Sequence, residues 1–166
     1  MKHNQANNVA SPVILALENK EDVAIESLRS LRTTLHFAFL EAQNNIIMIT
    51  GPSPGIGKTF VSVNLAVVMA DAGKKLLLID GDMRRGYINK VLGVNRENGL
   101  SELIFESISL DKAIHPIESA HFDFIATGAI PPNPSELLLH ERFANLLDNL
   151  SKQYDLVIID SPSILA

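Results

Sequence analysis

The segment Gly51–Thr59 constrains this chain more than any other part of its sequence. It reads Gly-Pro-Ser-Pro-Gly-Ile-Gly-Lys-Thr, and it lies between a short apolar run at 46–50 and a helical pattern at 58–72. Glycines let neighbouring backbone N–H groups turn toward one point, and the start of a helix adds a positive dipole there. A strand, a glycine-rich turn and a helix in this order are typical of a phosphate-binding loop.

The residue types in this loop indicate that its ligand is ATP with Mg²⁺. We expect the Lys58 ammonium to reach the β- and γ-phosphates and the Thr59 hydroxyl to bind the metal. The usual spacing places a glycine where this chain has Pro52, one residue after Gly51. A solvated Gly/Pro turn is the alternative, which the flanking strand and helix disfavour. The expected ATP-binding residues are Ser53, Pro54, Gly55, Ile56, Gly57, Lys58, Thr59 and Phe60.

Three aspartates follow two further apolar strands. The run 75–79 ends at Asp80, with Asp82 close behind, and the run 156–159 ends at Asp160. The carboxyl ends of parallel strands share one edge, so these acids should gather beside the phosphate loop. Mg²⁺ prefers carboxylate and hydroxyl oxygens, which makes Asp80 and Asp160 its expected ligands together with the threonine of the loop. A cap or turn role is the alternative for any one of them. The candidate catalytic residues are Lys58, Asp80, Asp82 and Asp160.

Strands and helices alternate along the chain, which predicts an α/β fold with a doubly wound, mostly parallel sheet of the P-loop NTPase type. We expect a flexible segment at 1–17 and one domain at 18–166, incomplete on its C-terminal side because the sequence stops soon after Asp160. The predicted elements are a helix from an Asn19 cap to about Ala42, a strand at 46–50, a helix at 58–72, a strand at 75–79, short helices within 86–120, a strand at 122–126, one or two helices to about Lys152 that begin with an Asn133/Glu136 capping box, and a strand at 156–159.

Composition narrows the class of function. The net charge is −5 and no basic block occurs, which argues against a nucleic-acid partner. Cysteine is absent, so thiolate metal sites and cysteine nucleophiles are excluded. No apolar run reaches the roughly 18–20 residues of a membrane span, and the polar start has no signal-peptide core. These features predict a soluble, cytoplasmic chain.

The motifs together resemble the bacterial tyrosine kinases of capsule and exopolysaccharide export. The resemblance rests on the Walker A loop, the strand 76–84 with its Asp-x-Asp-x-Arg ending, and the sequence Ile-Asp-Ser-Pro at 159–162. A Glu-x-x-Arg-x-x-Arg motif begins at Glu26, and the segment 131–138 matches a further part of the family. The resemblance covers about residues 18–166.

This resemblance implies an autophosphorylating, ATP- and Mg²⁺-dependent protein-tyrosine kinase. Asp80 and Asp82 would form a variant Walker A′ motif that helps hold Mg²⁺ and accepts the tyrosine hydroxyl proton, and Tyr87 would be an internal phosphorylation site. The implied partners are a membrane-anchored polysaccharide co-polymerase part, fused or separate, at the inner face of the plasma membrane, and a tyrosine phosphatase. The implied ring of subunits would form through Glu26, Arg29 and Arg32, although i, i+3 charges are also typical of an ordinary helix surface.

The sequence departs from the family, and two other functions compete. The family's C-terminal tyrosine cluster is missing, and Thr127 replaces a basic residue of many relatives. One competitor is an ATPase switch of the partitioning or division-site type, which usually carries a signature lysine where this chain has Ser53. The other is a non-catalytic, nucleotide-binding assembly module. Phosphotyrosine as the product favours the kinase, and free phosphate favours the switch.

Overall fold

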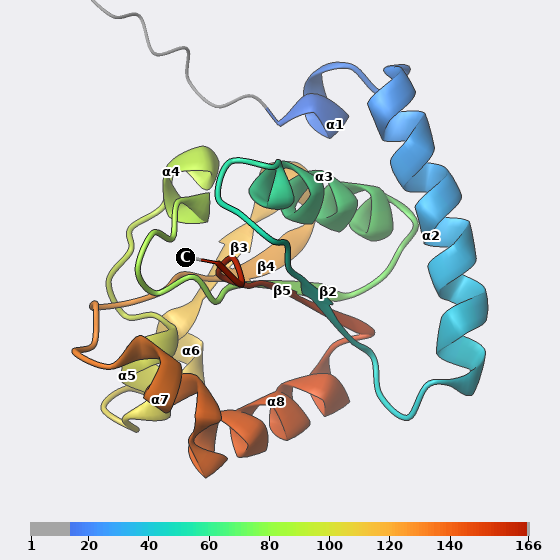
Figure 1. Cartoon of the computed structure of the whole chain (residues 1–166). Coiled ribbons are helices and arrows are strands. Elements are labelled where there is room, and N and C mark those ends of the chain that lie inside the picture. The colour runs from blue at the N-terminus through green and yellow to red at the C-terminus, as the bar shows by residue number, and fades with distance from the viewer. Residues whose placement is uncertain (1–13, 166) are drawn as a thin grey trace, which may run out of the picture.

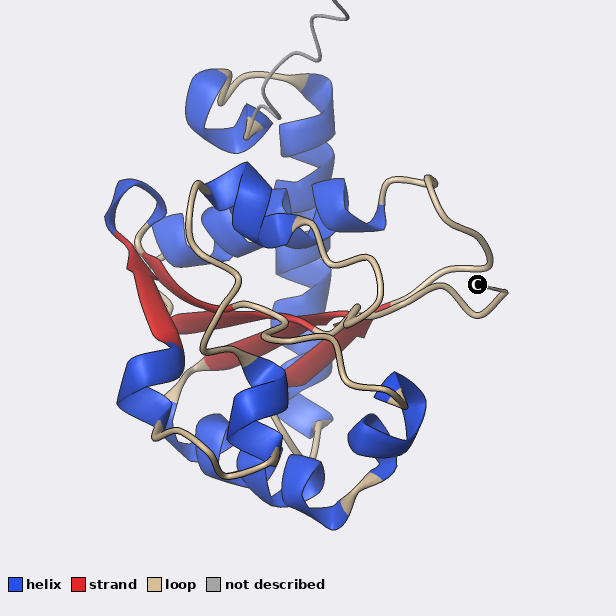
Figure 2. Cartoon of the chain, turned by 90° about the vertical axis from the view of Figure 1, so that its left-hand side faces the viewer, coloured by secondary structure: helices blue, strands red, loops and turns tan. Residues whose placement is uncertain are grey.

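The computed structural model describes residues 14–165, which build a five-stranded sheet with helices on both faces (Figures 1 and 2). The strand order is β1-β5-β2-β4-β3. All neighbouring strands pair in parallel except β3, which is antiparallel to β4. The α/β, mostly parallel sheet is therefore confirmed. The strands are β1 (Ile46–Ile49), β2 (Leu76–Asp80), β3 (Ile114–Ile117), β4 (Phe122–Ile125) and β5 (Leu156–Asp160).

The two central strands, β2 and β5, are buried along their whole length. Their continuous apolar runs suit strands that are covered on both faces. Their register pairs Leu77 with Val157 and Asp80 with Asp160. The two aspartates therefore end neighbouring strands at the same edge of the sheet.

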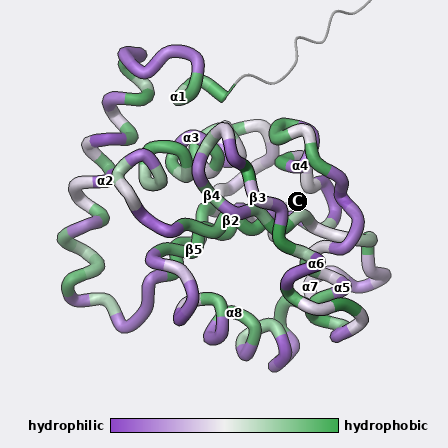
Figure 3. The backbone as a smooth tube through the Cα atoms, turned by 180° about the vertical axis from the view of Figure 1, so that it is seen from behind, coloured by the Kyte–Doolittle hydropathy of each residue, from purple (hydrophilic) through white to green (hydrophobic). Residues whose placement is uncertain are grey.

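The helices form one layer on each face of the sheet. Apolar side chains from the first four helices pack on the face that carries Leu76 and Leu78, and those from the last four pack on the face that carries Leu77 and Ile79. Hydrophobic residues are concentrated in the strands, whereas hydrophobic and hydrophilic residues alternate along α8 (Figure 3). The helices are α1 (Leu15–Glu18), α2 (Val23–Glu41), α3 (Lys58–Asp71), α4 (Ile88–Leu92), α5 (Leu100–Ile104), α6 (Leu110–Ala113), α7 (Pro134–Leu139) and α8 (Glu141–Gln153), and a 3₁₀ turn occupies Glu118–Ala120.

One predicted helix cap is wrong, and one predicted capping box does not form. The N-cap of α2 is Asp22 rather than Asn19, and the Asp22 carboxylate accepts a hydrogen bond from the Ala24 N–H at 2.8 Å. At α7 the N-cap is Asn133 and the helix begins at Pro134, as predicted, but the capping box does not form, because the Asn133 amide donates to the Glu136 carboxylate at 3.1 Å and the Asn133 side chain accepts no hydrogen bond from the backbone. In both cases a local hydrogen bond of a short polar side chain near the helix start decides the capping.

The segment 86–120 contains a strand that the sequence patterns did not predict. Besides α4, α5 and α6 it holds β3, the antiparallel edge strand. Pro116 lies within β3, and a residue without a backbone N–H is tolerated at a sheet edge. The proline made the run resemble a loop, and only its pairing with β4 makes it a strand.

The start of the described chain packs on α3. Residues 15–17 of the expected flexible segment belong to α1, where Ala16 is buried and its N–H donates to the Asn64 side chain at 2.8 Å. Residues 1–13 lie outside the described residues, and the domain boundary at 18 stays a prediction. Within residues 14–165, no helix combines the length and the apolar character that crossing a membrane requires.

We expect Tyr154→Phe to lower the free energy of unfolding by about 1 kcal/mol, the typical net value of one hydrogen bond. The buried Tyr154 hydroxyl donates to the Asp123 carboxylate at 2.7 Å, and burial raises the pKa of this phenol. Urea unfolding followed by circular dichroism measures the change. Tyr87→Phe alters an exposed ring and is the matched control. Equal stability of the two variants would contradict the assignment.

Candidate phosphate- and metal-binding site

The phosphate loop leaves β1 and enters α3 as expected. Gly55 and Gly57 have φ of +78° and +95°, a region in which side chains are strained. A Cβ at Gly51 would collide with the Ile56 side chain, which folds across the loop. A side chain at Gly51 would therefore require the exposed Ile56 side chain to move.

Asp160 joins the loop to β5. Its carboxylate accepts hydrogen bonds from the Thr59 hydroxyl at 2.8 Å and from the Ser62 hydroxyl at 3.0 Å. Burial raises the pKa of Asp160, and these hydrogen bonds and the Lys58 charge partly oppose that rise. The end of β5 is thereby fixed against the first turn of α3.

Asp80 lies beside Asp160 and is almost completely buried. Its carboxylate accepts hydrogen bonds from the backbone N–H groups of Asp82 and Ile88, both at 3.2 Å. Burial, followed by the negative charge of Asp160, raises the pKa of Asp80 to about 7. Two carboxylates held together away from water form a site that a cation would stabilise.

The available oxygens suit Mg²⁺ better than a metal held by protein alone. Among the described residues, no three His, Asp or Glu side chains converge on one point. Mg²⁺ commonly takes one or two carboxylates and completes its shell with water and phosphate oxygens. Thr59, Asp80 and Asp160 meet that pattern, so they would hold the ion beside the phosphates.

A pocket of about 230 Å³ opens in front of the loop. Inside it the Lys58 ammonium donates to the Ser163 hydroxyl at 2.8 Å. Asp82 is at its side, where its carboxylate accepts from the Arg85 N–H at 3.0 Å. Cationic groups and a carboxylate therefore share one hollow. The lining residues are Pro54, Gly55, Lys58, Thr59, Asp82, Arg84, Arg85, Pro162 and Ser163.

A smaller hollow of about 150 Å³ connects this region to α7. Pro134, Ser135 and Leu138 line it together with Asp82 and Ser163. The segment 131–138, which the sequence singles out only because it resembles part of the kinase family, thus lies next to the candidate site.

The structure places the other predicted site residues less centrally. Ile56 and Phe60 are exposed, at 51% and 42%, and Ser53 is partly buried beside the loop. Tyr87 is 42% exposed and does not line the phosphate pocket. The Lys90 ammonium lies 5.5 Å from the centre of its ring.

The Glu-x-x-Arg-x-x-Arg motif lies on α2. Arg29 pairs with Glu26 at 3.0 Å, and both remain partly or largely exposed. Arg32 instead donates to the Val68 carbonyl of α3 at 3.3 Å. Glu26 and Arg29 are therefore available on the surface, whereas Arg32 makes a contact within the chain. Their role between subunits stays a prediction.

Sequence reasoning missed the residues that support the acids. Arg96 donates to the Met83 carbonyl at 3.1 Å and to the Gly128 carbonyl at 3.0 Å, and so holds the turn after β2 against the loop after β4. Nothing in the local sequence marks Arg96. Ser62 had a signal, because it lies one helical turn after Lys58 and on the same side of α3.

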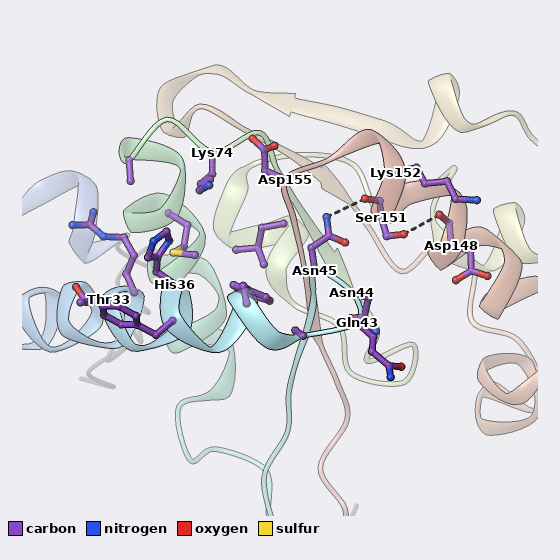
Figure 4. Close-up of a pocket in the computed structure, with 17 residues that line it drawn as sticks. Thr33, His36, Gln43, Asn44, Asn45, Lys74, Asp148, Ser151, Lys152 and Asp155 are labelled. Atoms are coloured by element: carbon purple, nitrogen blue, oxygen red, sulfur yellow. Dashed lines mark hydrogen bonds between the residues drawn. The ribbon is translucent and has the colours of Figure 1, made fainter.

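A hollow of about 1020 Å³, larger than the two beside the phosphate loop, lies away from this chemistry, and Figure 4 shows the residues that line it. Asn45, Lys74 and Asp155 line it, and these residues precede β1, β2 and β5. It is therefore at the amino ends of the strands, opposite the phosphate loop. The Asn45 amide donates to the Ser151 and Tyr154 carbonyls at 2.9 and 2.6 Å, which ties β1 to α8. Its size does not make it the functional site.

A phosphate loop after one strand, with a buried aspartate at the end of the adjacent parallel strand, defines a P-loop NTPase fold. A family model described as "AAA domain" matches residues 44–166. The chain belongs to this family.

Known relatives agree with the resemblance drawn from the sequence. The chain is 52% identical to a tyrosine-protein kinase, wzc, of Salmonella typhimurium over 153 residues, 92% of this chain and 21% of the relative. It matches the kinase domain of Escherichia coli tyrosine kinase ETK with a TM-score of 0.90 and 46% identity, covering 99% of this chain and 65% of that one. The resemblance to bacterial tyrosine kinases is confirmed.

A septum site-determining protein is structurally less similar. The Pyrococcus horikoshii protein MinD, complexed with Mg-ADP, has a TM-score of 0.62 and 28% identity over 74% of this chain and 50% of its own. The chain spans about a fifth of the length of curated relatives such as the wzc kinase. The likeness therefore concerns one part of such proteins.

We expect the stability of the protein to depend on pH through Asp80. The folded chain holds this proton more tightly than the unfolded chain, where an aspartate pKa is about 4, so the free energy of unfolding falls as pH rises from about 4 to 7. Asp80→Asn removes this contribution, and its melting temperature should fall less over that range. Asp111→Asn, on the exposed surface of α6, should keep the wild-type slope. Identical slopes for wild type and Asp80→Asn would show that the Asp80 assignment is wrong.

Proposed function

We propose that this chain is the ATP-binding part of an autophosphorylating protein-tyrosine kinase that regulates the synthesis and export of exopolysaccharide or capsule. The observation that carries the proposal is one pocket, in which Lys58 and Asp82 lie beside the Thr59–Asp160 hydrogen bond. The sequence likeness to proteins named tyrosine-protein kinases supports the same reaction.

The chain's own groups would bind and orient the nucleotide. Backbone N–H groups of the loop surround the β-phosphate at the start of α3, and the Lys58 ammonium reaches the β- and γ-phosphates. Thr59, Asp80 and Asp160 would hold Mg²⁺, which would neutralise phosphate charge when bound. The buried carboxylates keep their geometry because Ser62 and backbone N–H groups fix their oxygens.

In the proposed reaction a tyrosine hydroxyl oxygen bonds to the γ-phosphorus while the bond from that phosphorus to the β–γ bridging oxygen breaks and releases ADP. The phenolic proton passes to Asp82, which lines the pocket and is only partly buried. Asp80 is less suited to that task, because it is buried and its oxygens accept two backbone hydrogen bonds. Positioning and charge neutralisation supply most of the catalysis in such transfers.

The proposal includes the setting of the whole protein. Glu26 and Arg29 present a charged pair on the surface of α2, which suits contacts in a homo-oligomeric ring. A membrane-anchored polysaccharide co-polymerase part, fused or separate, would hold the domain at the inner face of the plasma membrane. A tyrosine phosphatase would reverse the modification.

Lys58→Met should abolish phosphotyrosine formation by the whole protein, because no other loop side chain supplies a positive charge at the β- and γ-phosphates. Anti-phosphotyrosine blotting with Mg·ATP measures the product. Lys20→Met, which breaks an exposed ion pair with Asp71, is a control for loss of a lysine. Full activity of Lys58→Met would refute the role of the loop, and free phosphate without phosphotyrosine in the wild type would favour the ATPase switch.

Arg29→Ala with Arg32→Ala should yield smaller assemblies of the whole protein in multi-angle light scattering. Arg29 provides the exposed charge and Arg32 orients α2 against α3 through Val68. Arg142→Ala removes an exposed arginine of α8 that pairs with Glu106, and it should leave the mass unchanged. An unchanged mass in the double variant would count against the ring.

A further inference from the structure

Ser163 holds the ammonium of the phosphate-loop lysine. It lies three residues after Asp160, is 9% exposed, and its hydroxyl oxygen accepts a hydrogen bond from the Lys58 ammonium at 2.8 Å. The next two residues attach this segment to the loop, because the Ile164 N–H donates to the Gly51 carbonyl at 2.9 Å and the Leu165 N–H donates to the Pro52 carbonyl at 3.0 Å. The serine is therefore held at a fixed distance from the loop.

The hydrogen-bonding capacity of the two groups leaves room for a ligand. A lysine ammonium has three N–H donors, so the bond to Ser163 leaves two for phosphate oxygens. A serine hydroxyl has one hydrogen in addition to its lone pairs. The oxygen of Ser163 is occupied by Lys58, and within residues 14–165 no group accepts the hydrogen of this hydroxyl in a hydrogen bond.

The position of Ser163 indicates which phosphate it faces. Backbone N–H groups at the start of α3 surround the β-phosphate, on the loop side of Lys58. Ser163 lines both the phosphate pocket and the adjoining hollow, in each case together with Asp82 and Arg84. It holds the Lys58 ammonium, the group expected to reach the β- and γ-phosphates, so the free hydrogen of its hydroxyl would lie near the transferred phosphate.

We propose that the Ser163 hydroxyl is a γ-phosphate contact that lets this chain distinguish ATP from ADP. It accepts one hydrogen bond from Lys58, which orients the ammonium, and donates its own hydrogen to a γ-phosphate oxygen. The inference rests on the proposed function, because it requires the loop to bind Mg·ATP. ADP has no γ-phosphate and gains nothing from this donor.

The test is a pair of affinities measured by isothermal titration calorimetry on this chain, for Mg·ADP and for the Mg²⁺ complex of the β,γ-methylene analogue of ATP. In Ser163→Ala we expect the dissociation constant of the analogue to rise about tenfold, in line with one hydrogen bond to a charged group, while that of ADP changes less than about twofold. Ser163→Thr keeps a hydroxyl and should restore the wild-type ratio.

Ser161→Ala is the matched control from the same segment. The Ser161 hydroxyl donates to the Ile49 carbonyl at 3.0 Å, toward β1 rather than the pocket. This variant should bind both nucleotides with the wild-type ratio. Ser163→Gly also lacks the hydroxyl and repeats the test if Ser163→Ala does not fold, as judged by a thermal melt.

The possible outcomes separate this inference from the proposed function. If wild type binds both nucleotides and Ser163→Ala weakens both equally, or neither, Ser163 is not a γ-phosphate contact, although the loop assignment stands. A wild-type chain that binds neither nucleotide would overturn the proposed function and this inference together. A selective loss of the analogue that Ser163→Thr restores supports the inference.

Discussion

The hydrogen bond between Thr59 and Asp160 depends on the strand order and makes the rest of the site possible. The loop follows β1, Asp80 ends β2, and β5 lies between these two strands. The last strand of the described chain therefore inserts its terminal carboxylate between the loop and the second aspartate. In this order Asp160 ends the strand next to β1, about 4.8 Å away, and Asp80 ends the strand one spacing further on. The topology, more than any local motif, brings residues a hundred positions apart into contact.

When no cation is bound, this arrangement destabilises the folded chain. Asp80 and Asp160 are buried side by side, and burial raises the pKa of both carboxyl groups. Two apolar clusters, one on each face of the sheet, provide the compensating stabilisation. Hydrogen bonds from Ser62 and from two backbone N–H groups fix the acids without neutralising them. A site that is unfavourable in the empty protein and favourable beside a cation is typical of functional positions.

The parts that the sequence predicted well are those with local signals. The loop, the buried strands and their terminal aspartates follow from residue type and short periodicity, and the structure brings all of them to one edge. The sequence did not reveal features that depend on distant partners. β3 becomes a strand only by pairing with β4, and Arg96 matters only because the Met83 and Gly128 carbonyls meet its guanidinium. The predicted cap of α2 was Asn19, and the hydrogen bond from the Ala24 N–H to Asp22 places the cap three residues later.

The fold alone does not determine the chemistry, because a septum site-determining protein shares it with a TM-score of 0.62. What separates the possible functions is the set of groups that face the end of the triphosphate. In this chain those groups follow strands rather than belong to the loop: Asp82 and Arg84 come after β2, and Ser163 comes after β5. Pro134 and Ser135 of α7 extend the same surface outward from the pocket. In the proposed reaction this carboxylate and this arginine would face the incoming tyrosine hydroxyl, whereas the serine hydroxyl would stay at the lysine ammonium.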